Sequence, residues 1–424
     1  MTDLLDDLTW RGLVHDSTDV EQLRAHLAEP RRVYAGFDPS RDSITIGNLV
    51  PLLLLRRFQL AGHTPVVVMG GGTGLVGDPS GKDAERQLLS DEQVASNVEA
   101  QRPIYENALA FDGANPAELR NNLDWLGGLS FLGVLRDTGK HFSVNMMIQK
   151  DSIKNRLETR DQGISYTEFS YMILQAYDYL WLFQNAGVTV QVGGSDQWGN
   201  VVAGIDLVRR VERKEAHGLT LPLVTKSDGG KFGKTESGAV WLTKKYTSAF
   251  AFYQFWLNTP DGDLERYLKI FTFLSRADIE ALSLRHAENP GAREGQRALA
   301  EAVTQVVHGA PGLHEARVAT EALFSGDVSA LAPETLSEVF ANAPSSAHDL
   351  ELLEGPGLGA VDLLLLAKVV KSKREAREFL DNGAISINGN RVDQSFVLTP
   401  AELLHDKMAL IRRGRKIWHV TLWS

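Results

Sequence analysis

The chain has 424 residues, enough for about three domains, and its 43% hydrophobic and 23% charged residues are typical of a soluble globular protein. It has no cysteine, which excludes disulfides, thiolate metal sites and a thiol nucleophile and favours a cytoplasmic location. The acidic start lacks a signal-peptide pattern, and the longest apolar run, at 49–55, is too short to span a bilayer, so we expect no membrane association.

The net charge of −10 is unevenly distributed along the chain. Residues 357–424 hold 11 Lys and Arg against 7 Asp and Glu, whereas the remaining residues hold 33 against 47. A basic end on an acidic body indicates a polyanion-binding module appended to an enzyme. Chance variation in surface charge is the alternative interpretation.

Residues 1–245 predict an α/β domain. Short apolar runs at 31–37, 64–70 and 188–194 alternate with longer periodic stretches. This alternation is typical of buried parallel strands with helices on both faces, which is the pattern of a Rossmann-like, doubly wound sheet.

The first of these strands leads into GFDPSRDSITIGNLVPLLLLRRFQ at 36–59. Pro51 is tolerated only in the first turn of a helix, so a helix begins just before it. Gly47 lets a ligand approach the backbone closely, and a helix N-terminus attracts phosphate. The side-chain donors at this turn are Ser40, Thr45 and Asn48. A role for Asn48 as a simple N-cap is the alternative.

The second strand leads into MGGGTGLVGDPSGK at 69–82. Its glycines satisfy the dinucleotide-binding spacing G-x-G-x-x-G, but Pro79 interrupts the helix that such a site requires. A structural glycine turn is the alternative. Asp78 places a carboxylate at the strand end, and Lys82 and Arg86 follow on one helix face.

The stretch 165–183 predicts a buried helix because it is apolar nearly all round. Tyr171, Gln175 and Asp178 recur at i, i+4 and i+7 and therefore share one face. Polar groups on a buried helix need partners. Two interpretations stay open: an internal hydrogen-bond network, or the wall of a pocket for a small polar ligand.

Two further segments carry polar and cationic side chains. VGGSDQWGN at 192–200 follows a strand, where Asp196 is suited to ribose hydroxyls in the ligand crevice of a doubly wound sheet. KSDGGKFGKTESG at 226–238 combines glycines, hydroxyls and three lysines. We interpret this segment as a mobile cationic flap over phosphates, with a solvated surface loop as the alternative.

Strand signals end after residue 245. Residues 246–324 predict helices, and 325–356, which contain three prolines, predict a linker. Residues 357–424 predict a small α+β module. Its local signals are a Ser372–Glu375 capping box, a C-cap at Gly383 and a hairpin turn at Asn388-Gly389.

Together these segments resemble the bacterial tyrosyl-tRNA synthetases, a class I aminoacyl-tRNA synthetase family. TIGN at 45–48 stands at the family's HIGH motif, and KFGKT at 231–235 stands at its KMSKS loop. GDPSGK, YTEFSYMILQAYDY and GGSDQWGN match the family pattern. The resemblance extends from WRGL at 10–13 to the C-terminal module, which resembles an S4-type RNA-binding domain.

The resemblance implies an activity: L-tyrosine is activated with ATP, with Mg²⁺ expected, to tyrosyl-adenylate and pyrophosphate. The tyrosyl group is then transferred to the 3′ end of tRNA(Tyr). It also implies a homodimer, whose interface we expect around 130–165. The expected division is a catalytic domain over 1–245, a helical domain on the anticodon side over 246–324, a linker over 325–356 and an S4-like domain over 357–424.

The same resemblance assigns site residues. Those expected to bind tyrosine are Tyr34, Asp78, Tyr171, Gln175, Asp178 and Gln197. Those expected to bind ATP are Gly36, Asp38, Gly47, Asn48, Gly194, Asp196, Leu223 and Val224. Those expected to act in catalysis, as donors to the departing pyrophosphate, are Lys82, Arg86, Lys231, Lys234, Thr235, Thr45 and Ser40. The basic face expected to bind RNA is Lys371, Lys373, Arg374, Arg377, Arg412, Arg413, Arg415 and Lys416.

One position departs from the family, which usually has histidine at 45 and 48 where this chain has Thr45 and Asn48. The Thr45 hydroxyl is shorter than an imidazole and carries no charge. A donor to a charged phosphate contributes about 1.5–3 kcal/mol, so its loss would slow activation about 10- to 100-fold. The alternative function is therefore a catalytically weak paralogue that binds RNA or tyrosyl-adenylate. A dinucleotide oxidoreductase is a third hypothesis.

Overall fold

The computed structural model describes residues 3–78, 89–150, 153, 164–227, 229–230, 232–235, 238–325, 328, 331–341, 343–414 and 417–424. The chain divides into two compact units. The first contains Met1–Ser248 and Phe252–Gly309, and the second contains Ala249–Ala251 and Ala310–Ser424. No helix in the described ranges is long and apolar enough to cross a membrane.

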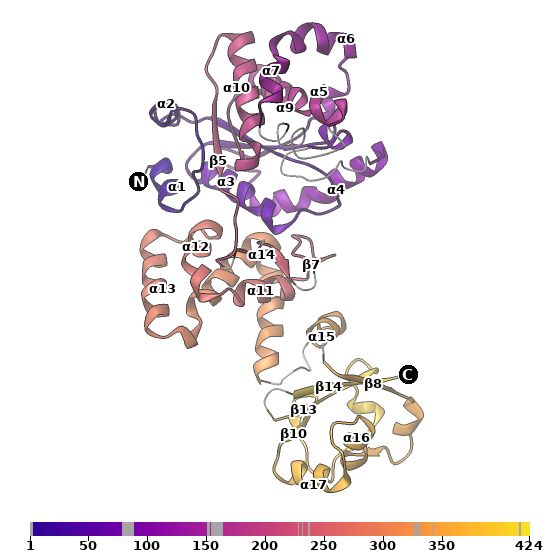
Figure 1. The fold of residues 1–424 in the computed structure, drawn as a ribbon. Coiled ribbons are helices and arrows are strands. Elements are labelled where there is room, and N and C mark those ends of the chain that lie inside the picture. Colours follow the sequence, from indigo (N-terminus) through magenta and orange to yellow (C-terminus); the bar gives the residue numbers. More distant parts are fainter. Residues whose placement is uncertain are drawn as a thin grey trace. The chain divides into compact units, whose positions relative to one another are not determined.

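A five-stranded sheet forms the centre of the first unit (Figure 1). Its strands are β1 (Arg32–Phe37), β2 (Thr64–Met69), β3 (Glu118–Asn121), β4 (Val188–Gly194) and β5 (His217–Leu221). All pair in parallel, in the order β3-β2-β1-β4-β5. The predicted doubly wound α/β fold is confirmed, since β1 lies at the centre and connections leave it in both directions.

Helices cover both faces of this sheet, as Figure 1 shows for α3 and α4 on one side and α9 and α10 on the other. The long helices are α3 (Leu49–Leu60), α4 (Asp91–Ala108), α9 (Tyr166–Ala186) and α10 (Trp198–Glu212). The shorter ones are α1 (Leu4–Trp10), α2 (Val20–His26), α5 (Leu123–Leu126), α6 (Phe131–Gly133) and α7 (Val144–Ile148).

The core between the sheet and α9 is largely aromatic. Tyr34 of β1 packs edge-on against Tyr179 of α9, and both side chains are almost fully buried. Trp125 of α5 stacks on Trp181 of α9 at 4.2 Å between ring centroids. This packing fixes the rotation of α9 about its own axis, and so fixes which of its side chains face the sheet.

The turn before α3 has the predicted form. A 3₁₀ turn, η1 (Ile46–Asn48), precedes the helix, and Pro51 lies in the first turn of α3, where its missing N–H removes no helical bond. Asn48 stands at the N-cap but makes no capping hydrogen bond with its side chain. Asn48 thus has the N-cap position that the alternative interpretation expected, without the side-chain bond that a capping residue usually makes.

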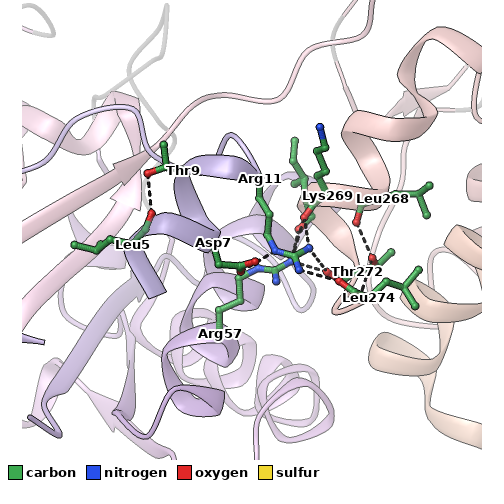
Figure 2. Close-up of polar contacts among 10 residues, drawn as sticks. Leu5, Asp7, Thr9, Arg11, Arg57, Leu268, Lys269, Thr272 and Leu274 are labelled. Carbon is green, nitrogen blue, oxygen red and sulfur yellow. Dashed lines mark hydrogen bonds and ion pairs between the residues drawn. The ribbon is translucent and has the colours of Figure 1, made fainter. Parts of the chain in front are cut away.

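The predicted helices after residue 245 are α11 (Ala249–Leu257), α12 (Asp261–Phe271), α13 (Arg276–Glu288) and α14 (Glu294–Ser325). Helix α14 is interrupted at Gly309, which has non-helical dihedral angles. Two buried arginines hold the C-terminal end of α12 (Figure 2). Arg57 of α3 donates to the carbonyls of Lys269, Ile270 and Thr272. Arg11, just after α1, donates to those of Lys269, Thr272 and Leu274.

The C-terminal part of the second unit contains a second sheet, ordered β11-β10-β13-β14-β8. Its strands are β8 (Ser345–His348), β10 (Ile385–Ile387), β11 (Asn390–Arg391), β13 (Met408–Arg413) and β14 (Ile417–Trp423), and β9 (Leu358–Gly359) pairs separately with β12 (Val397–Leu398). The helices are α15 (Pro333–Val339), α16 (Ala360–Leu366) and α17 (Lys373–Asp381).

The predicted hairpins are confirmed in this unit, and the capping box at α17 is confirmed in one of its two hydrogen bonds. Asn388 and Gly389 both have positive φ angles, 49° and 87°, and connect the antiparallel strands β10 and β11. The Ser372 hydroxyl accepts from the Glu375 N–H at the start of α17, whereas the Glu375 carboxylate accepts from the Lys371 N–H. Strands β13 and β14 form the second predicted hairpin.

The segment 325–356, expected to be a linker, contains ordered elements in the structure. Helix α15 lies within it, and β8 pairs in parallel with β14 at the edge of the sheet. The sequence of β8, SSAH, has no apolar alternation. Each residue of β8 pairs with one 75 positions later in the chain. No local pattern signals a contact of this kind.

Candidate active site

A cavity of about 540 Å³ opens at the carboxyl ends of β1, β2 and β4. Its walls are the segment after β1, the start of α3, one face of α9 and the turn between β4 and α10. This is the crevice in which open parallel sheets bind their ligands. Four carboxylates line it: Asp38, Asp78, Asp178 and Asp196.

One end of the cavity holds a buried carboxyl group and a buried phenol. Asp178 accepts from the Trp125 indole N–H at 2.7 Å and from the Asn122 amide at 2.9 Å. Burial raises the pKa of Asp178 to about 7, and the two donors act against this rise. The Tyr34 hydroxyl is buried and has no hydrogen-bond partner among the described residues. A buried hydroxyl without a partner on a cavity wall calls for a polar ligand atom.

A second cluster lies along α9. Gln197 donates to Asp78 at 2.6 Å, and Gln175 donates to Gln197 at 3.2 Å. Asn200 bonds the amide oxygens of both glutamines, and Tyr171 donates to Asp38 at 3.4 Å. Tyr171, Gln175 and Asp178 are hydrogen-bonded and also line the cavity, so this face of α9 holds an internal network and at the same time forms a pocket wall.

The turn before α3 forms the other end of the cavity. The Thr45 hydroxyl donates to the Asn48 side-chain oxygen at 3.2 Å, and Ser40 and Gly47 also line the wall. Backbone bonds join this turn to the segment after the 226–238 loop: Ile46 N–H to Val240 O and Leu242 N–H to Ile44 O, each at 3.0 Å.

The 226–238 loop returns to the same turn through Gly233. Its carbonyl accepts from the Val240 N–H at 2.9 Å. Its φ is +76°, and a Cβ at this position would lie 2.4 Å from Cγ2 of Ile46. Glycine is therefore the residue that fits here. Phe232 packs on Tyr267 and Phe271 of α12, so the loop is anchored on the helical segment as well.

Comparisons with known proteins agree with this geometry. A family model described as "tRNA synthetases class I (W and Y)" matches residues 26–325, and one described as "Tyrosine--tRNA ligase SYY-like C-terminal domain" matches 336–421. Tyrosine–tRNA ligases of Bacillus caldotenax and Aliivibrio fischeri are 50% and 48% identical to the chain, covering 100% of it and at least 99% of each relative. The chain belongs to the tyrosine–tRNA ligase family.

Solved structures support the membership. A C-terminally truncated mitochondrial tyrosyl-tRNA synthetase of Aspergillus nidulans aligns with a TM-score of 0.69 and 30% identity, over 76% of this chain and 95% of that one. A tryptophanyl-tRNA synthetase of Encephalitozoon cuniculi aligns at 14% identity with a TM-score of 0.53, which shows the shared fold alone. The dinucleotide oxidoreductase hypothesis is wrong, because the glycines after β2 form the short turn η2 (Thr73–Leu75) in a synthetase fold.

For this synthetase chain, the cavity brings together most of the residues expected in its site. Those that line it are Tyr34, Gly36, Asp38, Ser40, Thr45, Gly47, Asn48, Asp78, Tyr171, Gln175, Asp178, Gly194, Asp196, Gln197 and Leu223. Val224 does not line it. Lys82, Arg86 and Lys231 lie outside the described residues, as do the side chains of Lys234 and Thr235, whose backbone forms β6 (Lys234–Thr235).

Sequence reasoning missed several residues of the site. Asn122 and Trp125 reach Asp178 from the segment after β3, and Arg41 and Trp241 line the wall near Thr45. The available signal for Asn122 was its place directly after a strand, at the edge where ligands bind. Trp125 and Trp241 carry no pattern that separates them from core tryptophans.

The basic residues of the C-terminal domain divide into two groups. Lys371, Lys373, Arg374 and Arg377 are exposed at and on α17, and Lys373 pairs with Asp362. Arg413 of β13 instead donates to the Val369 carbonyl at 3.0 Å and lies over the Phe379 ring, which gives it a structural role. Arg412 lies over Trp418, and Arg415 and Lys416 are outside the described residues.

Proposed function

We propose that the chain activates L-tyrosine with ATP and transfers the tyrosyl group to the 3′ end of tRNA(Tyr). The observation that carries this proposal is the pair of Tyr34 and Asp178 on the cavity wall. A buried hydroxyl without a partner and a buried carboxyl group are together suited to a ligand hydroxyl, which both donates and accepts. Phenylalanine would leave both groups unpaired, at a cost of about 1–3 kcal/mol for each buried polar group.

The cluster along α9 is suited to the other end of an amino acid. An ammonium group donates three hydrogen bonds and needs acceptors, which Asp78, Tyr171 and Gln175 supply on one wall. We place the carboxylate of the amino acid near Gln197, which bonds both Asp78 and Gln175. This arrangement orients the carboxylate toward the nucleotide without a separate base.

The first step needs positioning and charge stabilisation more than proton transfer. The tyrosine carboxylate is already ionised at pH 7 and attacks the α-phosphorus of ATP, and the bond to the bridging oxygen breaks with its electron pair leaving on pyrophosphate. We assign the ribose to Asp196 and Gly194 and the phosphates to Ser40, Thr45, Gly47 and Asn48 at the N-terminal end of α3. Gly36, Asp38, Leu223 and Val224 are proposed to complete the ATP site. Lys82, Arg86, Lys231, Lys234 and Thr235 are proposed as further phosphate contacts.

Mg²⁺ is proposed to accompany the nucleotide. No cluster of three or more His, Asp or Glu side chains that could hold a metal ion occurs within the described ranges. The cavity offers single carboxylates, at Asp38, Asp78 and Asp196, and Mg²⁺ in nucleotide sites is commonly held by phosphates with one or two carboxylates. The ion would supply neutralisation of phosphate charge.

The rest of the chain is assigned by the same proposal. We propose a catalytic domain over 1–245, a helical domain over 246–324 and an RNA-binding C-terminal domain, and the pairing of β8 with β14 supports a start of this last domain before residue 345 rather than at 357. We propose a cytoplasmic homodimer that binds one tRNA across both subunits. Its interface would use apolar side chains exposed between 130 and 150, namely Phe131, Leu132, Leu135, Val144, Met146 and Ile148.

Tyrosine-dependent exchange between ATP and pyrophosphate tests the activation step, with Thr45→His measured alongside. Exchange with tyrosine and none with phenylalanine supports the proposal, and charging of tRNA(Tyr) supports its second half. Weak exchange that Thr45→His restores supports an enzyme limited at this turn. Absence of exchange in both proteins would overturn the proposal and favour the catalytically weak binding protein, for which nothing in the comparisons speaks.

A further inference from the structure

A single cation lines the described part of the cavity. Arg41 stands in the segment between β1 and α3, three residues after Asp38 and four before Thr45. The other charged side chains on the described wall are carboxylates, at Asp38, Asp78, Asp178 and Asp196. An acidic cavity repels a triphosphate unless cations oppose its charge, so the one arginine here requires an explanation.

Arg41 is not held by a carboxylate. In the described chain its guanidinium makes no ion pair and no hydrogen bond, and the residue is exposed. The adjacent carboxylate, Asp42, accepts from Lys245 and Tyr246, and these bonds lower its pKa. Asp42 is therefore engaged elsewhere, and the charge of Arg41 is left facing the cavity.

The position of Arg41 is nevertheless fixed, by stacking. Its guanidinium lies over the Trp241 ring, 5.6 Å from the centroid, which is within the range of a cation–π contact. Trp241 itself is held by a backbone bridge to Thr45, by a bond from its N–H to the Thr247 hydroxyl at 3.0 Å and by the Tyr246 ring. Stacking occupies the face of a guanidinium and leaves its five N–H donors, which point outward in its plane.

The turn beside Arg41 lacks charge. The Thr45 hydroxyl is neutral, and its hydrogen bond is directed to Asn48. Asn48 is neutral as well. Backbone N–H groups at the start of α3 attract phosphate but carry only a partial charge. Trp241 is the residue that forms the backbone bridge with Thr45, so the guanidinium stacked on its ring lies beside this turn. The guanidinium can therefore supply the positive charge that the turn lacks.

We propose that Arg41 binds the β- and γ-phosphates of ATP and the departing pyrophosphate, and so supplies the positive charge that Thr45 and Asn48 do not. This inference rests on the proposed tyrosine activation. Arg41 donates hydrogen bonds to phosphate oxygens and transfers no proton. The bond that forms joins the tyrosine carboxylate to the α-phosphorus, and the bond that breaks is the bridge to the β-phosphate. Arginine suits this role because its fork of donors matches a phosphate.

The test compares Arg41→Ala, Arg41→Gln and Arg41→Lys in tyrosine-dependent exchange and in the reverse reaction from tyrosyl-adenylate and pyrophosphate. Arg285→Ala is the control, since it removes an exposed arginine paired with Glu294 in the helical segment. We expect Arg41→Ala and Arg41→Gln to lower kcat/KM for ATP and for pyrophosphate about 10- to 100-fold. KM for tyrosine should stay within about twofold of wild type, and Arg41→Lys should recover part of the loss.

Thr45→His in the same series tests the link between the two positions. If the histidine contacts the same phosphates, Arg41→Ala lowers kcat/KM for ATP by a smaller factor in the Thr45→His background than in wild type. An equal loss of kcat/KM in both backgrounds would contradict the inference that Arg41 supplies the positive charge missing at Thr45. An ATP effect below about twofold, or an equal effect on tyrosine, overturns phosphate binding. Failure of exchange in the wild-type protein would instead overturn the proposed function itself.

Discussion

The ionisation of Asp178 depends on two donors from a neighbouring element. Burial favours its neutral form, and the N–H groups of Asn122 and Trp125 favour its charged form. Because the raised pKa of about 7 lies near physiological pH, a small loss of hydrogen bonding changes the fraction that is ionised. In the proposed site, the carboxylate form is the better acceptor for the phenol of tyrosine.

Trp125→Phe is predicted to raise the pKa of Asp178, since it removes one N–H and keeps a ring that stacks on Trp181. Loss of one hydrogen bond to a charged group is worth about 1–2 pKa units. At pH 7 the variant would hold Asp178 mostly neutral, and KM for tyrosine would rise about tenfold. The measurement is KM for tyrosine from pH 6.5 to 9, in which the defect should shrink as pH rises. A defect that is independent of pH would contradict the prediction.

Ionisation of Asp178 affects the stability of the fold in the opposite way to tyrosine binding: as pH rises, binding of tyrosine is expected to improve and the free energy of unfolding to fall. The folded pKa of Asp178 is raised above its ordinary value of 3.8, so the neutral form stabilises the fold below that value. This contribution is lost as pH rises from about 4 through about 7. An ionised Asp178, which the proposed site needs as an acceptor, therefore lowers the stability of the fold. Such a trade-off between stability and activity is common at functional sites.

Helix α12 of the helical segment contacts both α3 and the 226–238 loop. Its C-terminal carbonyls are held by Arg57 of α3 and by Arg11, whose own charge is paired with Asp7 (Figure 2). Cations at a helix C-terminus satisfy its unpaired carbonyls and oppose its dipole. The same helix α3 begins at the turn proposed to bind phosphate, and α12 also packs on Phe232 of the 226–238 loop. The packing of α12 therefore affects the position of both the turn before α3 and the 226–238 loop.

Arg57→Met is predicted to destabilise the protein by about 3 kcal/mol or more, because buried carbonyls lose their donor. Arg56→Met is the matched control, since Arg56 is the preceding residue and donates only to Gln59 in the described chain. Urea unfolding of both variants gives the comparison. Arg57→Lys should fall between them, because lysine keeps the cation but its side chain is shorter than the one whose Nη2 contacts all three carbonyls, and its ammonium is more strongly hydrated. Equal stability of Arg57→Met and Arg56→Met would contradict this account of α12.

The helices and strands could be predicted from the local periodicity of the sequence. Contacts between segments far apart in the chain could not. The spacing of Tyr171, Gln175 and Asp178 is a property of one helix, so their shared face followed from the sequence, and all three line the cavity. The contact of Trp125 with Asp178 depends on how α5 packs on α9, and the stacking of Arg41 on Trp241 joins residues two hundred positions apart. Such contacts leave no period in either segment. The strand β8 was missed for the same reason.

The two compact units differ in where their charged side chains gather. The first holds the acidic cavity, and the second carries the exposed lysine and arginine side chains at α17. Binding of a small amino acid and nucleotide needs an enclosed site, whereas binding of an RNA backbone needs an open cationic surface. In the proposed function the two recognition tasks belong to different units, so substitutions in one unit should affect one task.

The triple substitution Lys371→Ala, Arg374→Ala and Arg377→Ala is predicted to raise KM for tRNA and to leave tyrosine-dependent exchange unchanged. Each lost phosphate contact reduces the salt slope of RNA binding by about one, so the variant should bind RNA with a slope lower by up to about three. The double variant Arg374→Lys, Arg377→Lys keeps the charge and serves as the control. Because these side chains are exposed, the fold should survive their loss. A fall in exchange equal to the fall in charging would show that the surface acts on catalysis, and unchanged charging would show that RNA binds elsewhere.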